Sequence, residues 1–122
     1  MPDLFDEIFS LSPQIRYVAL VQGELEPMLR ERPDLVGASS AESDRFEELL
    51  VNPTVLGLIE RRGRIDCGGL VYVIIRYGNF FQILHVVPGG HLSVAVEPHG
   101  EPLRVIEALR PLVARLRSMG AA

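Results

Sequence analysis

The side chains best suited to chemistry are one cysteine and three histidines. Cys67 precedes two glycines and no basic partner is evident beside it, so we interpret it as a half-buried thiol at the entrance of a strand rather than a nucleophile. His85, His91 and His99 show neither HxH nor HxxxH spacing, and they therefore do not predict a shared metal site. We expect His85 to lie in the core opposite Tyr72, and the other two histidines to be solvated turn residues.

The carboxylates in the helical segments do not indicate a catalytic pair either, because their spacing is typical of solvated helix faces. The chain has no HExxH, GxSxG, CxxC or dinucleotide-binding motif. Residues 88–91 lack both the residue order of a phosphate-binding loop and a helix to follow. The sequence thus predicts no catalytic residue, metal site or cofactor and does not favour an enzyme. The carboxylates concerned are Asp3, Asp6, Glu7, Glu42, Asp44, Glu47 and Glu48.

Length and composition indicate one globular domain over residues 1–122. The chain is 48% hydrophobic and 23% charged, which is close to the globular average. A net charge of -4 argues against a nucleic-acid binder. One cysteine and an acidic first segment without a signal-peptide pattern predict a cytoplasmic protein. No apolar run approaches the ~20 residues that cross a bilayer, so we expect a soluble protein without membrane contact.

Hydrophobic periodicity and turn signals divide the chain into a helix, two strands, a long helix, three strands and a last helix. The apolar positions recur at helical spacing in the first and last of these segments, and alternation or continuous apolar runs mark the strands. The predicted ranges are residues 2–11, 16–21, 25–29 and 40–63, three strands within 70–96, and 102–119.

The long helix has signals for its start, its middle and its end. Ser39 and Glu42 fit a capping box. Asn52-Pro53 predicts a break or a kink, with Asn52 able to cap the second piece, because proline has no backbone N–H and clashes with the preceding turn. Gly63 is expected to be the C-cap glycine. We therefore expect one long helix in two pieces.

Residues 71–98 form a ribbon of apolar strands with two hairpin signals, Gly78-Asn79 and Gly89-Gly90. With two-residue turns, neither face of the resulting three-stranded meander is polar. An antiparallel sheet with one solvated face would alternate apolar and polar residues, so both faces must be covered. The helices are the available covers.

The order of these elements resembles the roadblock/dynein light chain domains, which have a profilin-like architecture. The resemblance covers nearly the whole chain and is carried by IRYVALVQGELEP, by the helix from Ser40, and by VIIRYGNFFQILHVVPGGHLSVAVEPHGEPL. It implies an α+β fold with a five-stranded antiparallel sheet and helices on both faces. It also implies a small, non-enzymatic homodimer or heterodimer that regulates a Ras-like GTPase or serves as an assembly adaptor.

A ligand-sensing domain remains the alternative, because helix-covered sheets can hold small molecules in a pocket. Tyr72, Tyr77 and His85 would then be the polar contacts. A densely filled core would favour the protein-binding module, whereas a cavity of roughly several hundred cubic ångströms at the sheet would favour the ligand sensor.

The two edges of the expected sheet differ. Pro27 lies in the second strand and blunts one edge, because proline cannot donate to a ladder. Residues 70–77 would expose an unprotected, strongly β-prone edge, so we expect a two-fold copy of the chain to cover it, with the long helices packing across the axis. The predicted interface residues are Val71, Tyr72, Val73, Ile74, Ile75, Phe46, Leu50 and Leu56.

Overall fold

The computed structural model describes residues 3–35 and 41–119. The helices and strands follow the predicted order, with two short additions: a 3₁₀ turn after the second strand and a π-helical turn inside the long helix. The elements are α1 (Leu4–Leu11), β1 (Ile15–Gln22), β2 (Met28–Glu31), η1 (Pro33–Leu35), α2 (Ala41–Phe46), the π-helical η2 (Glu47–Val51), α3 (Asn52–Asp66), β3 (Val73–Arg76), β4 (Phe81–Val87), β5 (Gly90–Val96) and α4 (Pro102–Met119).

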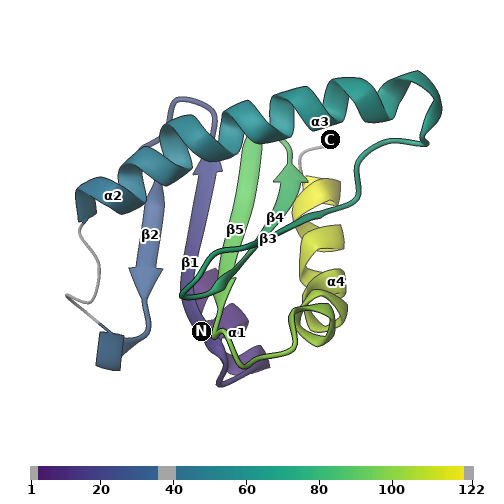
Figure 1. Ribbon diagram of the computed structural model, residues 1–122. Coiled ribbons are helices and arrows are strands. Elements are labelled where there is room, and N and C mark those ends of the chain that lie inside the picture. Colours follow the sequence, from purple (N-terminus) through teal and green to yellow (C-terminus); the bar gives the residue numbers. More distant parts are fainter. Residues whose placement is uncertain (1–2, 36–40, 120–122) are drawn as a thin grey trace.

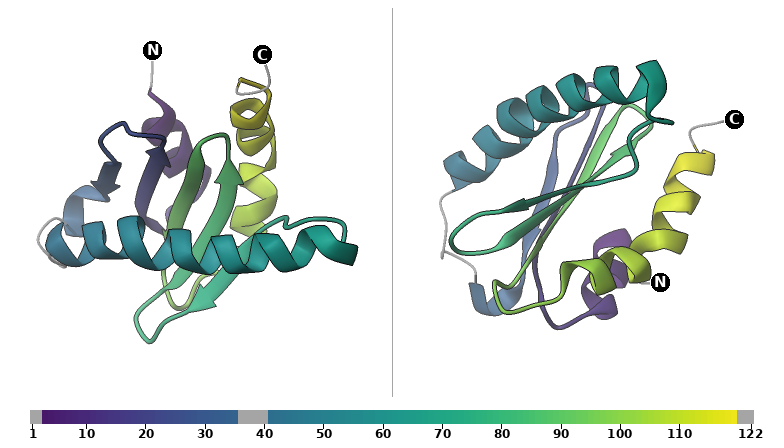
Figure 2. Two further views of the ribbon diagram at one scale, coloured as in Figure 1. Left: turned by 90° about the horizontal axis from the view of Figure 1, so that it is seen from above. Right: turned by 45° about the vertical axis from the view of Figure 1, so that its right-hand side comes forward.

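The strands form one five-stranded antiparallel sheet in the order β2-β1-β5-β4-β3. The helix α2–η2–α3 runs across one face as a continuous rod and extends past the β3 side of the sheet (Figures 1 and 2). Helices α1 and α4 cover the other face (Figure 2, right). This is the predicted α+β architecture with helices on both faces.

The two sides of the sheet are packed differently. The side under α1 and α4 holds the main apolar core, whereas the side under α2–α3 has a small cluster of Tyr17, Ala19 and Ala95, with Leu29 and Phe80 packed against it. Apolar packing therefore dominates one layer, and the other layer must be held largely by other contacts. The buried residues of the main core are Phe5, Ile8, Ile15, Val18, Leu20, Ile83, Val87, Leu92, Val94, Val96, Val105, Ile106, Leu109, Leu112 and Val113.

Both hairpins of the meander are present, and the second is shifted. The ladder places Arg76 opposite Phe81 around the Gly78-Asn79 turn, as predicted. The second turn is Pro88-Gly89 rather than Gly89-Gly90, since Val87 pairs with Gly90 and Gly89 has a positive φ of 79°. The resulting shift in pairing is two residues, and an even shift leaves every side chain on its predicted face.

The predicted second strand is displaced toward the C-terminus. It was expected at residues 25–29 with Pro27 inside, but β2 begins at Met28, so Pro27 precedes the strand. A residue without an N–H is better accommodated ahead of the ladder than within it. β2 still lies at a sheet edge, as predicted.

Of the predicted break or kink at Asn52-Pro53, the break is absent, and the irregularity is a π-helical turn just before Pro53. Helical structure continues through it, and the N–H of Asn52 bonds to the carbonyl of Glu47, five residues back. Proline can neither donate to the carbonyl four residues earlier nor pack closely against it, and a wider turn just before it relieves that conflict. The predicted capping box includes Ser39 and Ser40, which lie outside the described residues.

The predicted end of this helix is also wrong, because Gly63 lies inside α3, which continues to Asp66. Gly63 is buried, and its carbonyl accepts hydrogen bonds from Cys67 and Gly69. A Cβ on Gly63 would lie 3.3 Å from the backbone of Gly69 and Leu70. The glycine is therefore required by the close return of the chain and not by a positive φ.

The first strand of the meander is shorter than predicted. β3 spans Val73–Arg76, so residues 70–72 of the expected strand lie outside the ladder. The last helix has the predicted bounds, 102–119, with Pro111 inside it, and it bends part-way along its length (Figure 2, right). The bend agrees with the effect of an internal proline.

We expect Gly57→Ala and Gly63→Ala, both in α3, to change stability differently. Gly57→Ala should raise the free energy of unfolding by about 0.5–1 kcal/mol, because no heavy atom lies within 4 Å of its new methyl group. Gly63→Ala should lack this gain, since its methyl group presses on the backbone of Gly69 and Leu70. Urea unfolding measures both changes. Equal gains in stability for the two variants would contradict the close contact between Gly63 and the backbone of Gly69 and Leu70.

Candidate functional site

The first notable group is a fully buried carboxylate, Glu48, between the helix and the sheet. Its Oε2 accepts a hydrogen bond from the Tyr17 hydroxyl at 2.9 Å, and its Oε1 accepts one from Asn52 Nδ2 at 2.9 Å. Nε2 of His91 lies 2.8 Å from the same Oε1. Three donors from β1, β5 and the start of α3 thus converge on one side chain.

This arrangement corrects two predictions. Glu48 was expected on a solvated helix face, and His91 was expected to be a solvated turn residue, yet both are buried. A sequence signal existed: His91, Ser93 and Gln82 share one face of the predicted meander, so that face carries polar residues at regular positions. Buried polar side chains need partners, and a carboxylate on the covering helix supplies one.

Tyr17 contributes as a hydrogen-bond donor. Burial, reinforced by the neighbouring Glu48 carboxylate, raises the pKa of Tyr17 far above its ordinary value. The phenol therefore stays protonated at neutral pH and donates its hydrogen bond to Glu48.

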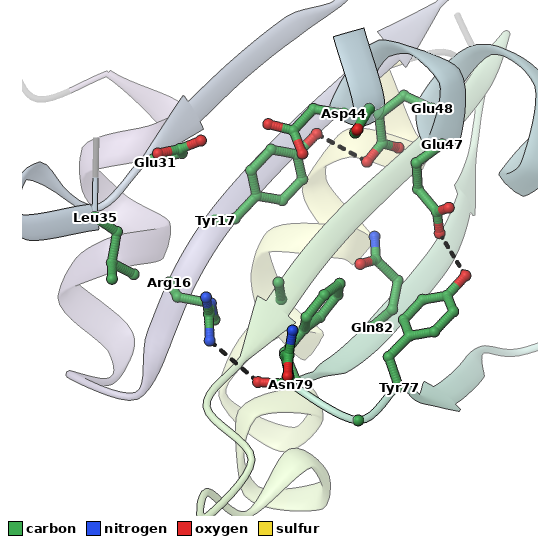
Figure 3. A pocket seen from close by; sticks show the side chains of 14 residues that line it. Arg16, Tyr17, Glu31, Leu35, Asp44, Glu47, Glu48, Tyr77, Asn79 and Gln82 are labelled. Atoms are coloured by element: carbon green, nitrogen blue, oxygen red, sulfur yellow. Dashed lines mark hydrogen bonds between the residues drawn. The ribbon is translucent and has the colours of Figure 1, made fainter. Parts of the chain in front are cut away.

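A pocket of about 430 Å³ lies beside this network, between α2–η2, the sheet and the turn that joins β3 to β4 (Figure 3). Aromatic rings and carboxylates line it, and the small side chain of Ala95 lies at its sheet side. The lining residues are Arg16, Tyr17, Glu31, Leu35, Ser43, Asp44, Glu47, Glu48, Tyr77, Gly78, Asn79, Phe80, Gln82 and Ala95.

The lining is predominantly acidic, with four carboxylates and one arginine. Nη1 of Arg16 donates to the Asn79 carbonyl at 3.1 Å and lies 3.5 Å from Glu97, so this cation is held at one end of the pocket. Glu47 accepts a hydrogen bond from the Tyr77 hydroxyl at 2.9 Å (Figure 3). Burial raises the pKa of Glu47, and burial together with Glu47 raises the pKa of Tyr77 to about 12.

Of the three polar contacts predicted for a ligand pocket, Tyr77 is among the residues that line this one, whereas Tyr72 and His85 are not. Tyr72 and His85 instead make an edge-on ring contact, with centroids 6.2 Å apart. His85 is buried as predicted, but neither of its ring nitrogens forms a hydrogen bond within the described part of the chain. Burial, with the nearby Arg117 guanidinium, lowers the pKa of His85 to about 4.

Cys67 differs from its prediction, because it is exposed at the end of α3 and Nη1 of Arg62 lies 3.3 Å from its sulfur. Within residues 3–35 and 41–119, no three His, Cys, Asp or Glu side chains gather in a way that could hold a metal ion. Over the same ranges, none of the helices combines the length and apolar character required to span a bilayer. His99 is exposed, as expected.

The residues predicted for a dimer interface fall into two groups. Phe46 and Leu50 are exposed on the outer side of the helix, with 58% and 56% of their surface accessible, but Leu56 is 4% exposed and packs inside the chain. Val71 and Tyr72 are exposed just before β3. The remaining three, Val73, Ile74 and Ile75, are half-buried on β3.

Comparison with known proteins gives a structural likeness alone. No protein-family model matches the chain, and no curated protein matches it. Among solved structures, MglC from Myxococcus xanthus, a roadblock-fold protein, superposes with a TM-score of 0.55 at 14% sequence identity, over 93% of this chain and 95% of that one. The chain therefore has a roadblock-like fold.

We expect Tyr17→Phe to lower the free energy of unfolding by about 1–3 kcal/mol, because it removes a donor from a buried carboxylate. Tyr77→Phe is a matched control: it also removes a hydroxyl from a glutamate, but at a half-buried position, and should cost less than half as much. Urea unfolding of both variants measures the difference. In a Glu48→Gln background, Tyr17→Phe should lower the free energy of unfolding by a smaller amount. An undiminished decrease would contradict the hydrogen bond between Tyr17 and Glu48.

The low pKa of His85 predicts a pH-dependent stability. The unfolded chain protonates His85 near 6.5 and the folded chain near 4, so the contribution of neutral His85 is fully present above pH 6.5 and is lost as the pH falls toward 4. The total loss is on the order of 3 kcal/mol. The free energy of unfolding of the unsubstituted chain should therefore fall relative to His85→Leu across this interval, whereas His99→Asn should follow the unsubstituted chain. If the free energies of unfolding of the unsubstituted chain and of His85→Leu changed in parallel with pH, the predicted contribution of His85 would be contradicted.

Proposed function

We propose that this chain is a non-catalytic, homodimeric protein-binding module of the roadblock type, which regulates or scaffolds a small Ras-like GTPase or a signalling or motility complex. The roadblock-like fold supports the class of protein. We infer the homodimer from two exposed features on the same side of the molecule. One is an apolar stripe on the helix, and the other is an open strand edge.

The helix stripe comprises Phe46, Leu50, Leu58 and Ile65. These residues recur at helical spacing along the outer side of α2–η2–α3, and all four are exposed, Leu58 by 63%. Scattered apolar residues are ordinary on a protein surface, but a row of large ones along one helix marks an interaction surface. Leu49 and Ile59, which flank the stripe, are also exposed and widen it.

The open edge is β3, which pairs only with β4 in the described sheet. The opposite edge, β2, is flanked by charged side chains: Arg30 bonds Asp3 and Asp6, and Arg32 bonds Asp34 and Glu97. Such charges protect an edge against pairing, and β3 has Val73, Ile74 and Ile75 in their place.

A second copy of this chain is the occupant that fits both features. Two β3 strands related by a two-fold axis pair antiparallel, so the sheet continues across the interface and the two helix stripes face one another. A stable obligate dimer of this kind buries on the order of 2,000 Å². Leu56 supports the helix from the inside of each chain in this arrangement and does not touch the partner.

The non-catalytic character is supported by the state of the one carboxylate–imidazole pair in the site. Glu48 and His91 are buried, and the hydrogen bonds of Tyr17 and Asn52 already occupy the carboxylate. A general acid or base must reach its substrate directly or through one water. This pair serves the fold.

Light scattering coupled to size-exclusion chromatography tests the pairing. At micromolar concentration the unsubstituted chain should have the mass of two chains, and Leu58→Glu should shift it to one chain, because the charge would be buried at the axis. Leu103→Glu is the matched control: Leu103 is 62% exposed, but it lies on α4, across the sheet, and this variant should stay dimeric. A folded monomer of the unsubstituted chain would overturn the dimer.

A second arm tests the partner. The dimer is titrated with a purified Ras-like GTPase encoded in the same genome, loaded with GDP or with a non-hydrolysable GTP analogue. Preferential binding of one nucleotide state, weakened in Leu58→Glu, is the expected result. Failure of both forms to bind would overturn the GTPase partner while leaving the pairing intact.

A further inference from the structure

We propose that residues 70–72 form a pH-sensitive latch, which is held against α4 while His85 is neutral and is released when His85 takes up a proton. These residues lead from the end of α3 into β3 and pass beside the C-terminal part of α4 (Figures 1 and 2). The inference goes beyond the pairing and does not depend on it, because it concerns contacts within one chain.

The first contact that holds the latch is the side chain of Arg117, near the end of α4. The β3–β4 ladder ends with Val73 opposite Leu84, and the same register, continued, places Val71 opposite Val86. Nε of Arg117 donates to the Val86 carbonyl at 3.1 Å, and its Nη2 donates to the Val71 carbonyl at 3.4 Å. One side chain therefore bridges the two segments where the backbone ladder has ended.

The second contact is between the rings of Tyr72 and His85. They meet edge-on, and His85 is only 4% exposed under this cover. Neither ring nitrogen of His85 forms a hydrogen bond to any part of the chain that the structure describes. Buried polar groups are ordinarily hydrogen-bonded, so this imidazole is kept from water by its neighbours and not by partners of its own.

The sheet offers no countercharge to His85. On β5, Leu92 lies directly opposite it, and the adjacent His91 faces Glu48 on the other side of the sheet. Among the described residues, no carboxylate contributes to the pKa of His85. A proton on this ring would therefore be a buried charge without compensation.

Toward α4 and the latch, His85 faces a fixed cation. Burial, reinforced by the Arg117 guanidinium, lowers the pKa of His85 to about 4. The Val71 carbonyl acts in the opposite direction, because it would accept a hydrogen bond from the protonated ring, but it already accepts one from Arg117. Protonation thus sets two cations against one carbonyl and weakens the contact that holds the latch.

The latch is the part of this cover that can move most easily, since it lies outside the ladder and Val71 is 63% exposed. Its release would expose His85 to water and return its pKa to about 6.5. A proton then binds the released form more tightly, and the balance shifts toward release about thirtyfold between pH 8 and pH 5. A chain that opens in this way takes up the proton above pH 4 and loses less global stability than one with a fixed latch.

An NMR titration of the full, unsubstituted chain from about pH 8 to about pH 4.5 tests the latch. The His85 ring should titrate within this interval. Over the same interval the NOE between the Tyr72 and His85 rings and the hydrogen-bonded Nε–H signal of Arg117 should be lost, while the amide signal of Val94 in the central strand persists. Titration of His85 with the NOE retained, no titration of His85, or loss of all native signals together would each overturn the proposal.

Two arginine variants separate the bridge from a general effect of charge. Arg117→Gln removes the guanidinium, so the pKa of His85 should rise and the NOE between the Tyr72 and His85 rings should already weaken at neutral pH. Arg110→Gln is the matched control, because Arg110 is exposed on the same helix and pairs with Glu107. It should change neither readout. Equal effects of the two variants, or an unchanged His85 titration in Arg117→Gln, would refute the role of Arg117.

A histidine variant shows whether the proton acts through this ring. His85→Leu cannot take up a proton, so the Nε–H signal of Arg117 should stay in place down to about pH 4.5. His99→Asn removes an exposed histidine and should behave like the unsubstituted chain. Loss of the Arg117 signal at acid pH in His85→Leu would show that another group drives the release and would overturn the proposal.

Discussion

The burial of the Glu48 carboxylate is the constraint on which the helix-to-sheet layer depends. Removing an ionised carboxylate from water costs several kcal/mol, and the cost is offset only when charge-assisted hydrogen bonds surround it. Tyr17, Asn52 and His91 provide those bonds from two strands and the helix itself. Because the apolar cluster on this face is small, these directional contacts specify where the helix lies on the sheet.

The π-helical turn and the pocket follow from the same layer. Glu48 and Asn52 are four residues apart, and the wide turn between them lets both face the sheet although Pro53 follows at once. Beneath the helix the strands carry small side chains, Ala19 and Ala95, which cannot fill the space that a large apolar residue would occupy. A layer held by hydrogen bonds over small residues leaves a cavity at its margin, and the neighbouring acidic side chains line it.

Much of the fold could be predicted from the periodicity of the sequence. The order of helices and strands along the chain, the faces of the meander and the bounds of α4 followed from alternation, helical spacing and turn residues. The predicted faces were correct although the second hairpin turn was placed one residue too late. The sequence could not show that Glu48 faces inward, because a glutamate in a helix is ordinarily solvated and its partners Tyr17 and His91 lie far away in the chain. Likewise Gly63 has the local signal of a helix end, and only the return of the chain across it shows a packing role.

The π-helical turn η2 has side chains on both the inner and the outer side of the helix. Glu47 and Glu48 face the pocket and the sheet, whereas Leu49 and Leu50, the next residues along, face outward. A second chain packed on Leu50 would therefore act directly on η2, which is the least regular part of the helix. The buried Glu48 is held by β1 and β5, so it limits how far this turn can move when the outer side of the helix is covered.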